Sequence, residues 1–447
     1  MKKLILSAIL GFTLISCGIQ QNSTKMTDWK HTTNIYEVNV RQYTKEGTFK
    51  AFQKELPRLQ KMGVKTLWFM PITPIAQKEK KGSLGSPYAA QDYTSINPEF
   101  GTLDDFKNLV NEAHKMGFKV IIDWVANHTG WDHVWTKSHP EYYVHDADGS
   151  FHRASGMDDI IELDYKNPEM RLAMIDAMKY WVKETNIDGF RCDLASWVEV
   201  DFWQQARPEV EKIKPLFFLG EFDELENPDY GKVFDASYSW SWMHKTEDFY
   251  KKKLPLTELT DLLAKYSAIG GNSMRAWFTS NHDENSWNGT EYEKYGEMAK
   301  PLAVFSATWD GVPLMYSGQE LPMLNKRLEF FEKDPIPWHG SYKLEEFYKK
   351  LHELKSKNPA LRGGDANATT KILQTNAPDK VLAYLRKNGD DEVLVILNLS
   401  ETQHLKLQIL DDAVKGKYKS LFSGLTTDFD TKPTIEMYKW EHLVFEK

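Results

Sequence analysis

The sequence predicts an α/β fold: a (β/α)₈ barrel with a small domain inserted after the third strand, followed by an all-β C-terminal domain. Three observations lead to this prediction. Short apolar runs alternate with amphipathic stretches from residue 34 onward. A long polar and aromatic segment, residues 127–165, interrupts that alternation. After Leu361 the pattern changes to short alternating runs separated by turn residues.

The strand candidates are short runs rich in apolar and β-branched residues. They lie at residues 34–40, 65–70, 118–125, 187–193, 216–219, 233–235, 274–280 and 312–317. The run at 118–125 is almost continuously apolar, as a parallel strand buried on both faces must be. An open doubly wound sheet has the same alternation, but no glycine-rich nucleotide loop follows the first strand. We therefore expect a closed barrel.

The stretches between these runs carry helix-start signals. Thr48 precedes a helical pattern as a candidate N-cap, and Thr102 with Asp105 fits a capping box. Asn167 followed by Pro168 is typical of a helix beginning, because proline fits the first helical position. Each amphipathic stretch is therefore expected to form a helix outside the barrel.

The domain boundaries follow from the breaks in the pattern. The barrel is predicted over residues 31–361, and 127–165 is too long for a structureless loop, so it is predicted to be an inserted domain. Residues 362–447 contain alternating runs such as Val381–Leu385 and Val393–Leu397. These runs predict a C-terminal β-sandwich.

Residues 1–17 resemble a bacterial lipoprotein signal peptide. Two lysines precede an apolar segment, Leu4–Ile15, which is too short to span a bilayer. Cys17 follows where cleavage is expected, so it is predicted to be the lipidated N-terminus; a plain secretory signal is the alternative. Residues 18–30 are polar without periodicity and predict a flexible tether.

This signal predicts an outer-membrane lipoprotein in the cell envelope of a Gram-negative bacterium. Residues 18–21 carry no charge, which slightly favours the periplasmic face over the cell surface. The only other cysteine is Cys192, so the fold is expected to hold by core burial without a disulfide.

The composition limits the partners. The net charge is −8, with both signs mixed, which disfavours nucleic acid and leaves membrane contact to the N-terminal lipid alone. The 15 tryptophans and 20 tyrosines could supply the flat apolar faces with polar edges that sugar rings require. Most of these rings are expected in the core.

Polar side chains stand where several predicted strands end. In a (β/α)₈ barrel the carboxyl ends of the strands carry the active site. Arg191 and Asp193 are two residues apart, so they share one face of their strand, and Cys192 points to the other. A charged pair is too costly to bury against the helices, so both should face the barrel mouth. There Arg191 is expected to keep Asp193 ionised.

Two further acids, Glu221 and Asp283, end two other strands. A single buried carboxylate is more often part of a structural ion pair than of an active site. Three carboxylates at three strand ends of one barrel instead indicate acid–base or nucleophilic chemistry.

These segments resemble conserved regions of the α-amylase family of glycoside hydrolases, family 13. The resemblance is carried by residues 123–128, 189–193, Glu221 and 281–283, together with Ser86-Pro87-Tyr88 after the second strand. The order of the motifs agrees with the predicted strand ends. The layout of barrel, inserted domain and β-rich tail is similar as well.

The resemblance implies roles for these residues. Asp193 corresponds to the nucleophile, Glu221 to the general acid/base and Asp283 to the third acid, which stabilises the transition state. The implied substrate-binding residues are Tyr88, Asp123, His128, Arg191 and His282: Arg191 steers the nucleophile, both histidines bind the glucose being cleaved, Tyr88 stacks beneath it, and Asp123 supports the site.

The implied activity is retaining hydrolysis of α-1,4-glucosidic bonds in starch, maltodextrins or related α-glucans. Retention requires two carboxyl groups about 5–5.5 Å apart. An α-1,6-glucosidase or an α-glucan transglycosylase on the same fold is the first alternative, although residues 160–164 differ from the variant associated with α-1,6 enzymes. A non-catalytic glycan-binding protein is the second, and such relatives usually lose an acid.

The sequence departs from the family at two positions. Many α-amylases carry Lys and His where this chain has Ser196 and Trp197. Trp197 is either a stacking face on the leaving-group side or a packed core residue, and Trp287 is a candidate for sugar stacking.

No cofactor is expected for the chemistry. A structural calcium ion is left open, because the resemblance matches Asn127 and Glu162 to calcium ligands and hard oxygens suit calcium. A salt-bridged surface glutamate is the other interpretation of Glu162.

Overall fold

The computed structural model describes residues 29–269, 273–321, 326–338 and 343–447. The predicted signal peptide with Cys17 and most of the predicted tether therefore lie outside the described residues. The tether prediction is wrong at its end, because Trp29–Thr32 form a short helix, α2. Lys30 anchors this helix to the barrel through an ion pair with Asp235, with Nζ and Oδ1 3.0 Å apart.

Eight parallel strands close into a barrel in the order β1-β10-β9-β8-β7-β6-β3-β2, which confirms the predicted fold. Their bounds are β1 (Ile35–Val38), β2 (Thr66–Phe69), β3 (Lys119–Val125), β6 (Gly189–Asp193), β7 (Phe217–Asp223), β8 (Ala236–Tyr238), β9 (Met274–Trp277) and β10 (Val312–Tyr316).

One predicted strand is misplaced. The sixth was expected at residues 233–235, but β8 begins at Ala236. Residues 233–235 lead into it: Val233 and Phe234 are buried in the apolar layer, and the Asp235 carboxylate accepts the backbone N–H of Phe218 at 2.9 Å. An apolar lead-in has the same sequence pattern as a short strand, which explains the error.

The fifth strand is longer than predicted, and this affects the site. It was expected to end at Leu219 but continues to Asp223, so Glu221 lies inside β7. The register with β8 shifts between Gly220 and Asp223. Such an irregularity re-aims side chains near the rim of a barrel.

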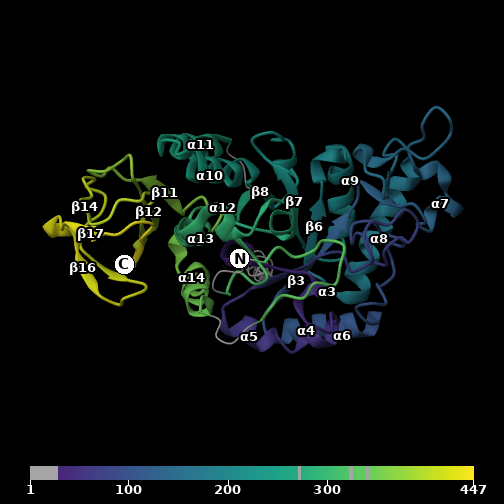
Figure 1. The fold of residues 1–447 in the computed structure, drawn as a ribbon, viewed down its shortest axis with the longest axis horizontal. Coiled ribbons are helices and arrows are strands. Elements are labelled where there is room, and N and C mark those ends of the chain that lie inside the picture. The colour runs from purple at the N-terminus through teal and green to yellow at the C-terminus, as the bar shows by residue number, and fades with distance from the viewer. Residues whose placement is uncertain (1–28, 270–272, 322–325, 339–342) are drawn as a thin grey trace, which may run out of the picture.

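Helices cover the outside of the barrel (Figure 1). They are α3 (Val40–Tyr43), α4 (Phe49–Gln53), α5 (Leu56–Lys61), α6 (Leu103–Lys115), α8 (Pro168–Thr185), α9 (Val200–Glu211), α10 (Trp240–Lys252), α11 (Thr257–Ile269), α12 (Glu291–Tyr295), α13 (Ala299–Thr308) and α14 (Glu345–Lys357). The predicted caps at Thr48, Thr102 and Asn167 all accept backbone N–H groups of their helices.

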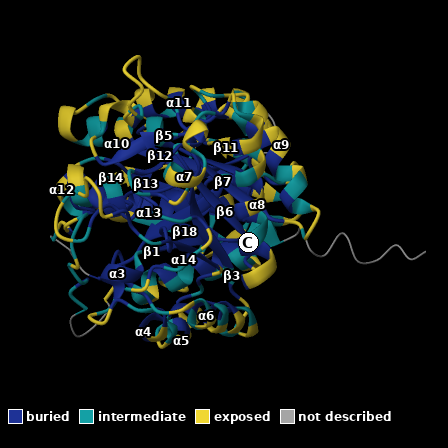
Figure 2. Cartoon of the chain, turned by 90° about the vertical axis from the view of Figure 1, so that its right-hand side faces the viewer, coloured by how far each residue is buried: buried dark blue, intermediate teal, exposed yellow. Residues whose placement is uncertain are grey.

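The barrel strands are buried on both faces, as Figure 2 shows by their dark colour. Trp68 and Ile121 pack inside the barrel, whereas Leu67 and Ile122 pack outward against the helices. Cys192 is fully buried in this outer layer, as the alternation along its strand predicts.

The inserted segment is a small subdomain held by one antiparallel pair of strands, β4 (His128–Gly130) and β5 (Ile160–Glu162). It also contains a short helix, α7 (Trp135–Ser138). In Figure 1, α7 lies at the end of the molecule opposite the C-terminal strands.

The C-terminal domain is built from two sheets. A six-stranded sheet has the order β11-β12-β13-β18-β15-β16, and β14 pairs with β17 in a second sheet. The bounds are β11 (Thr369–Ile372), β12 (Val381–Asn388), β13 (Asp391–Asn398), β14 (Leu405–Leu407), β15 (Lys417–Ser420), β16 (Thr426–Asp428), β17 (Ile435–Met437) and β18 (His442–Glu446).

The larger C-terminal sheet is apolar on both faces. Leu382 and Tyr384 pack toward Phe305 and Trp309 of the barrel domain. Ala383 and its neighbours on the other face pack against residues of the second sheet. This apolar interface joins the C-terminal domain to the barrel.

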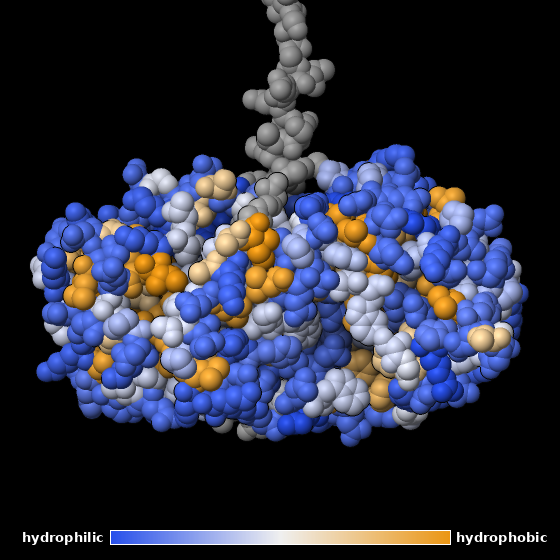
Figure 3. Space-filling view, turned by 90° about the horizontal axis from the view of Figure 1, so that it is seen from above, coloured by the Kyte–Doolittle hydropathy of each residue, from blue (hydrophilic) through white to orange (hydrophobic). Residues whose placement is uncertain are grey.

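The surface in Figure 3 is mainly hydrophilic, with small separate apolar patches. Within the described part of the chain, no helix is both long and apolar enough to cross a bilayer.

Candidate active site

A pocket of about 430 Å³ lies where strands β6 and β7 end. Its lining includes Asp193, Glu221 and Asp283, so the structure brings the three predicted acids to one cavity. The other lining residues are Lys81, Ser86, Tyr88, His128, Met157, Asp159, Ile160, Leu194, Trp197, His282, Trp287, Phe330 and Phe331.

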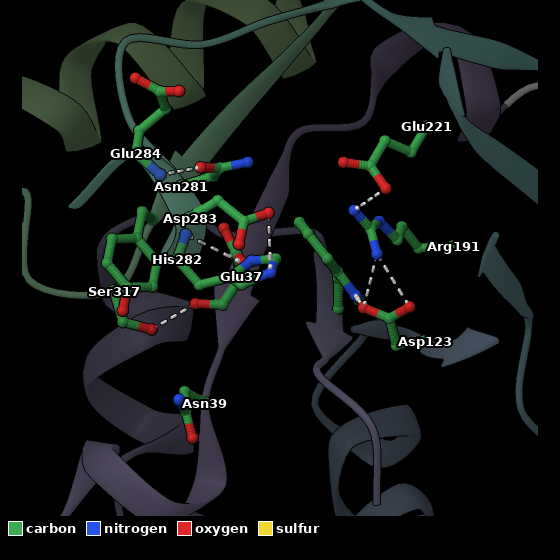
Figure 4. A network of polar contacts seen from close by, with 12 residues as sticks. Glu37, Asn39, Asp123, Arg191, Glu221, Asn281, His282, Asp283, Glu284 and Ser317 are labelled. Atoms are coloured by element: carbon green, nitrogen blue, oxygen red, sulfur yellow. Dashed lines mark hydrogen bonds and ion pairs between the residues drawn. The ribbon is translucent and has the colours of Figure 1, made fainter. Parts of the chain in front are cut away.

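Arg191 lies between the carboxyl groups of Glu221 and Asp123 (Figure 4). Its Nη1 lies 2.9 Å from Asp193 Oδ1 and 3.0 Å from Asp123 Oδ1. Its Nη2 lies 2.8 Å from Glu221 Oε2, an ion pair without an aligned hydrogen bond. One fully buried guanidinium is thus shared by three carboxyl groups.

Burial and this shared arginine together determine the protonation of Asp193 and Glu221. Burial raises the pKa of Asp193 and that of Glu221 to about 7 each, although Arg191 lowers both. Burial raises the pKa of Asp123 to about 6 in the same way. Arg191 lowers the pKa of Asp193, the direction the sequence interpretation expects, but burial of the carboxyl group raises that pKa by more. Near neutral pH the pair can hold one proton, which suits one acid and one base.

A backbone group also orients Glu221. Leu194 follows Asp193 in a left-handed conformation, with φ 42° and ψ 44°. This turn lets its N–H donate to Glu221 Oε2 at 2.9 Å. A non-glycine residue in this region is strained and usually marks a functional constraint. The residue pattern carried no signal for this contact, because it is made by the main chain.

Asp283 and His282 form the opposite side of the site. His282 Nε2 lies 3.3 Å from Asp283 Oδ2, and its Nδ1 contacts the carboxylate of Glu37 on β1. Burial lowers the pKa of His282, but Asp283 and Glu37 outweigh it and raise that pKa to about 9. His282 is therefore protonated at neutral pH.

Glu37 is a site residue that the sequence interpretation missed. It is fully buried, and its burial raises its pKa even though His282 lowers it. An available signal was the acid itself, which interrupts the otherwise apolar strand Ile35–Val38. A buried charge inside a strand requires a partner, and here the partner is His282.

Tyr88 contacts both His282 and Asp123. The Tyr88 ring stacks on His282, with centroids 5.3 Å apart, and its hydroxyl donates to Asp123 Oδ2 at 3.1 Å. Trp68 Nε1 donates to the same oxygen at 3.1 Å. Asp123 does not line the pocket.

His128 lines the pocket and is buried. Burial lowers its pKa to about 4, so the ring is neutral at pH 7. Its Nδ1 accepts from the amide of Asn127 at 3.2 Å, which places the ring proton on Nε2. Among the described residues, Nε2 has no hydrogen-bond partner.

Four aromatic residues complete the pocket wall. The Trp197 side chain is 48% exposed. The interpretation of Trp197 as a packed core residue is therefore wrong, and its ring is accessible for stacking. Trp287 is 53% exposed and contacts Phe330 and Phe331. The sequence interpretation missed Phe330 and Phe331, because the sequence of a loop does not show which strand end of the barrel the loop will cover.

The inserted domain is tied across the pocket to the loop after β2. Lys81 Nζ lies 2.9 Å from Asp159 Oδ1, and both residues line the cavity. This contact joins two walls that are far apart in sequence.

The calcium expectation gains no support. Asn127 directs its amide to His128, and Glu162 is half-exposed with its carboxylate 3.8 Å from His152. Within the described residues, no group of three or more His, Cys, Asp or Glu side chains is arranged to hold a metal ion.

Comparison with known families agrees with this geometry. The family described as alpha amylase, catalytic domain matches residues 21–149 and 141–371, which is more than half of the chain. The alpha amylase C-terminal all-beta domain matches residues 372–439.

Individual relatives are similar over most of the chain. A noncanonic maltogenic alpha-amylase from Thermotoga neapolitana has a crystal structure that is 30% identical, with a TM-score of 0.84, and the match covers 93% of this chain and 99% of that one. Alpha-amylase 2 from Dictyoglomus thermophilum is 24% identical over 89% of this chain and 73% of its own length. A cyclomaltodextrinase from a Bacillus species is 27% identical over 78% of this chain and 65% of its own length.

Proposed function

The chain belongs to the α-amylase family and is a glycosidase, and we propose that it hydrolyses α-1,4-glucosidic bonds in starch, maltodextrins or related α-glucans with retention of configuration. The observation that carries the proposal is the pairing of Asp193 and Glu221 with two nitrogens of the same guanidinium. This pairing favours a close carboxyl pair, and retaining enzymes need a separation of about 5–5.5 Å.

In the first step Asp193 attacks the anomeric carbon while Glu221 donates its proton to the leaving oxygen. The glycosidic C–O bond breaks and an ester to Asp193 forms. In the second step Glu221 takes a proton from water, whose oxygen attacks the same carbon, and Asp193 leaves as a carboxylate. The pKa values near 7 suit this exchange, because the proton is neither too tightly nor too weakly held.

The surrounding groups bind the sugar ring whose bond is cleaved. Tyr88 offers its ring beneath the sugar, and neutral His128 offers the N–H of Nε2 to its hydroxyls. Protonated His282 lines the pocket and directs its own Nε2 to Asp283 and to the Tyr88 hydroxyl, so it holds these two residues toward the sugar. Asp283 is the most exposed of the three acids, with 37% side-chain exposure, and its charge can stabilise the positive oxocarbenium-like transition state. No metal or cofactor takes part in these steps, and a structural calcium ion remains outside the proposal.

Linkage is tested by product analysis. We expect maltoheptaose to be cut to shorter maltooligosaccharides, with isomaltose left intact. Cleavage of isomaltose, or of only the α-1,6 bonds of pullulan, would support the α-1,6-glucosidase alternative. Products longer than the substrate would support the transglycosylase alternative. Binding of α-glucan without release of reducing sugar would overturn the proposal in favour of a glycan-binding protein.

We also propose that the protein is exported and anchored in the Gram-negative envelope by lipid on Cys17, with the periplasmic face favoured. Labelled fatty acid should be incorporated into the wild type and not into Cys17→Ala. Protease added to intact cells should spare the protein, and digestion under those conditions would place it on the cell surface.

A further inference from the structure

A π-helical turn, Glu284–Asn288, follows directly after Asp283. The π-helix is a rare conformation that occurs mostly at functional sites. Asp283 and Glu284 are neighbours in the chain, but their side chains point in different directions (Figure 4). Asp283 lines the pocket, whereas Glu284 is buried and does not line it. The turn therefore joins a pocket acid to a buried acid that takes no part in the two cleavage steps.

Glu284 has a buried partner, Lys294 on α12. The Lys294 side chain is fully buried, and its Nζ contacts Glu284 Oε2. The same Nζ lies 3.5 Å from Glu247 Oε2 and 2.9 Å from Met243 Sδ, both on α10. A buried ion pair adds little net stability compared with apolar residues of similar volume, because both charges lose their water. This pair is therefore better explained by the conformation that it fixes than by the stability that it adds.

The helix that carries Lys294 is itself fixed. Thr290 and Glu293 form a capping box at the start of α12. Tyr295, next to Lys294, is fully buried, and its hydroxyl donates to the Met243 carbonyl of α10 at 3.3 Å. α12 therefore supports Lys294 rigidly, so its ammonium group holds Glu284 in one place.

Glu284 in turn fixes the backbone on one side of Asp283. Its Oε1 accepts from Asn288 Nδ2 at 2.9 Å, which closes the π-helical turn. Its N–H donates to Asn281 Oδ1 at 2.8 Å, and its carbonyl accepts the Gly289 N–H at 2.9 Å. Among the described residues, the Asp283 carboxylate has one ion-pair partner, His282, and no hydrogen bond. Its direction therefore depends strongly on this backbone.

We propose that Lys294 is a positioning residue for Asp283: acting through Glu284 and the π-helical turn, it fixes the direction in which the Asp283 carboxylate faces the sugar. The inference rests on the proposed function, in which Asp283 stabilises the transition state. Lys294 does not line the pocket, so it acts on the reaction only through other residues. An error of about 1 Å in the position of a reacting group lowers the rate by up to about 10²-fold.

The test is a double-mutant cycle of Lys294→Met and Asp283→Asn, measured as fluoride release from α-maltosyl fluoride. Methionine keeps most of the length of lysine and removes the charge. Lys294→Met should lower kcat about 10- to 10²-fold. In the Asp283→Asn background the same change should leave kcat within about twofold, because no carboxylate is left to position. A general structural role would lower kcat by the same factor in both backgrounds.

Two further variants guard the interpretation. Lys294→Met leaves the acids Glu284 and Glu247 without this cation, so the variant Glu284→Gln/Lys294→Met covers the case in which the single variant does not fold. It should show the same loss of kcat and the same dependence on Asp283. Lys251→Met removes a more exposed ion pair of Glu247 and should leave kcat and Tm close to wild type.

The outcomes distinguish this inference from the proposed function. Equal losses of kcat with and without the Asp283 carboxylate, or an unchanged kcat in folded Lys294→Met, would overturn the positioning role and leave the glycosidase mechanism intact. A wild type that releases no fluoride would overturn the proposed function and the inference together. Wild-type kcat in Asp283→Asn would remove Asp283 from its role, and the inference would fall with it.

Discussion

Asp193 and Glu221, on neighbouring strands of the barrel, are held by the two terminal nitrogens of Arg191 at 2.9 and 2.8 Å. The arginine compensates part of the cost of burying both acids, and the two carboxyl groups compete for its single charge. The reactivity of each acid therefore depends on the other acid and on the arginine that both contact.

Asp193→Asn should abolish turnover while leaving the fold intact. The amide is nearly isosteric with the carboxylate but cannot attack the anomeric carbon, so kcat should fall by about 10³-fold or more. Reducing-sugar release measures the rate, and calorimetric binding of maltoheptaose should remain within a few-fold of wild type. Asp412→Asn, at an exposed C-terminal position, is the control. Near-normal activity in Asp193→Asn would remove this residue from the nucleophile role.

The rate should depend on pH as a bell centred near neutrality. Asp193 must be ionised and Glu221 protonated, and burial raises both pKa values to about 7. Activity should therefore fall below pH 7 as Asp193 gains a proton, and above pH 7 as Glu221 loses its own. The profile of kcat/KM on maltoheptaose measures both limbs. A rate that rises steadily to pH 10 would show that Glu221 is not the acid.

Glu221→Gln should lose about 10²–10⁴-fold in kcat on maltoheptaose, because the leaving oxygen is no longer protonated. Defluorination of α-maltosyl fluoride should be less affected in the first step, since fluoride leaves without a proton. Added azide, which needs no general base, should then rescue the second step and form maltosyl azide. If both substrates lose activity equally and azide has no effect, the variant has lost its structure or the role is wrong.

Glu37→Gln should destabilise the protein more at low pH than at high pH. The pKa of His282 is raised to about 9 in the fold, against about 6.5 for an unfolded chain. Its stabilising contribution is therefore complete below about pH 6.5 and is lost as the pH rises through about 9. The drop in Tm relative to wild type should be larger at pH 6 than at pH 10. Glu401→Gln, an exposed residue, is the control, and a pH-independent drop would contradict the pairing.

Asp188→Asn should weaken the fold without touching the pocket. The Asp188 side chain is 6% exposed and contacts His114, Lys119 and Lys214. Burial raises its pKa, but the His114 hydrogen bond and the two lysines outweigh this and lower it to about 2. The contribution is present above about pH 3.9, the unfolded value, and is lost as pH falls through about 2.

Urea unfolding at pH 7 should show a loss of about 2 kcal/mol for Asp188→Asn, as for a buried hydrogen bond to a charged group. Asp201→Asn removes an exposed ion pair with Arg171 and should cost far less. Equal losses in the two variants would contradict the difference in burial.

Much of the fold followed from periodicity. Seven of the eight predicted strands overlap observed ones, because a strand buried on both faces is an apolar run whatever its neighbours are. The sixth predicted strand does not overlap an observed one, because Val233 and Phe234 pack in the apolar core without pairing in the sheet. The position of Asp193 at the end of β6 was also readable, since alternation fixes which side of a strand a residue faces. Glu221 lies inside β7 and Asp283 lies after the end of β9, so alternation alone did not place these two acids.

What the residue order determined by itself was local: where strands and helices lie, and which acids stand at the barrel mouth. Only the tertiary structure decided that Leu194 donates to Glu221, that Glu37 pairs with His282, and that Trp197 is exposed. The protonation of Asp193 and Glu221 was likewise decided only by the tertiary structure. These properties depend on burial and on partners brought together through space, and neither is a function of distance along the chain.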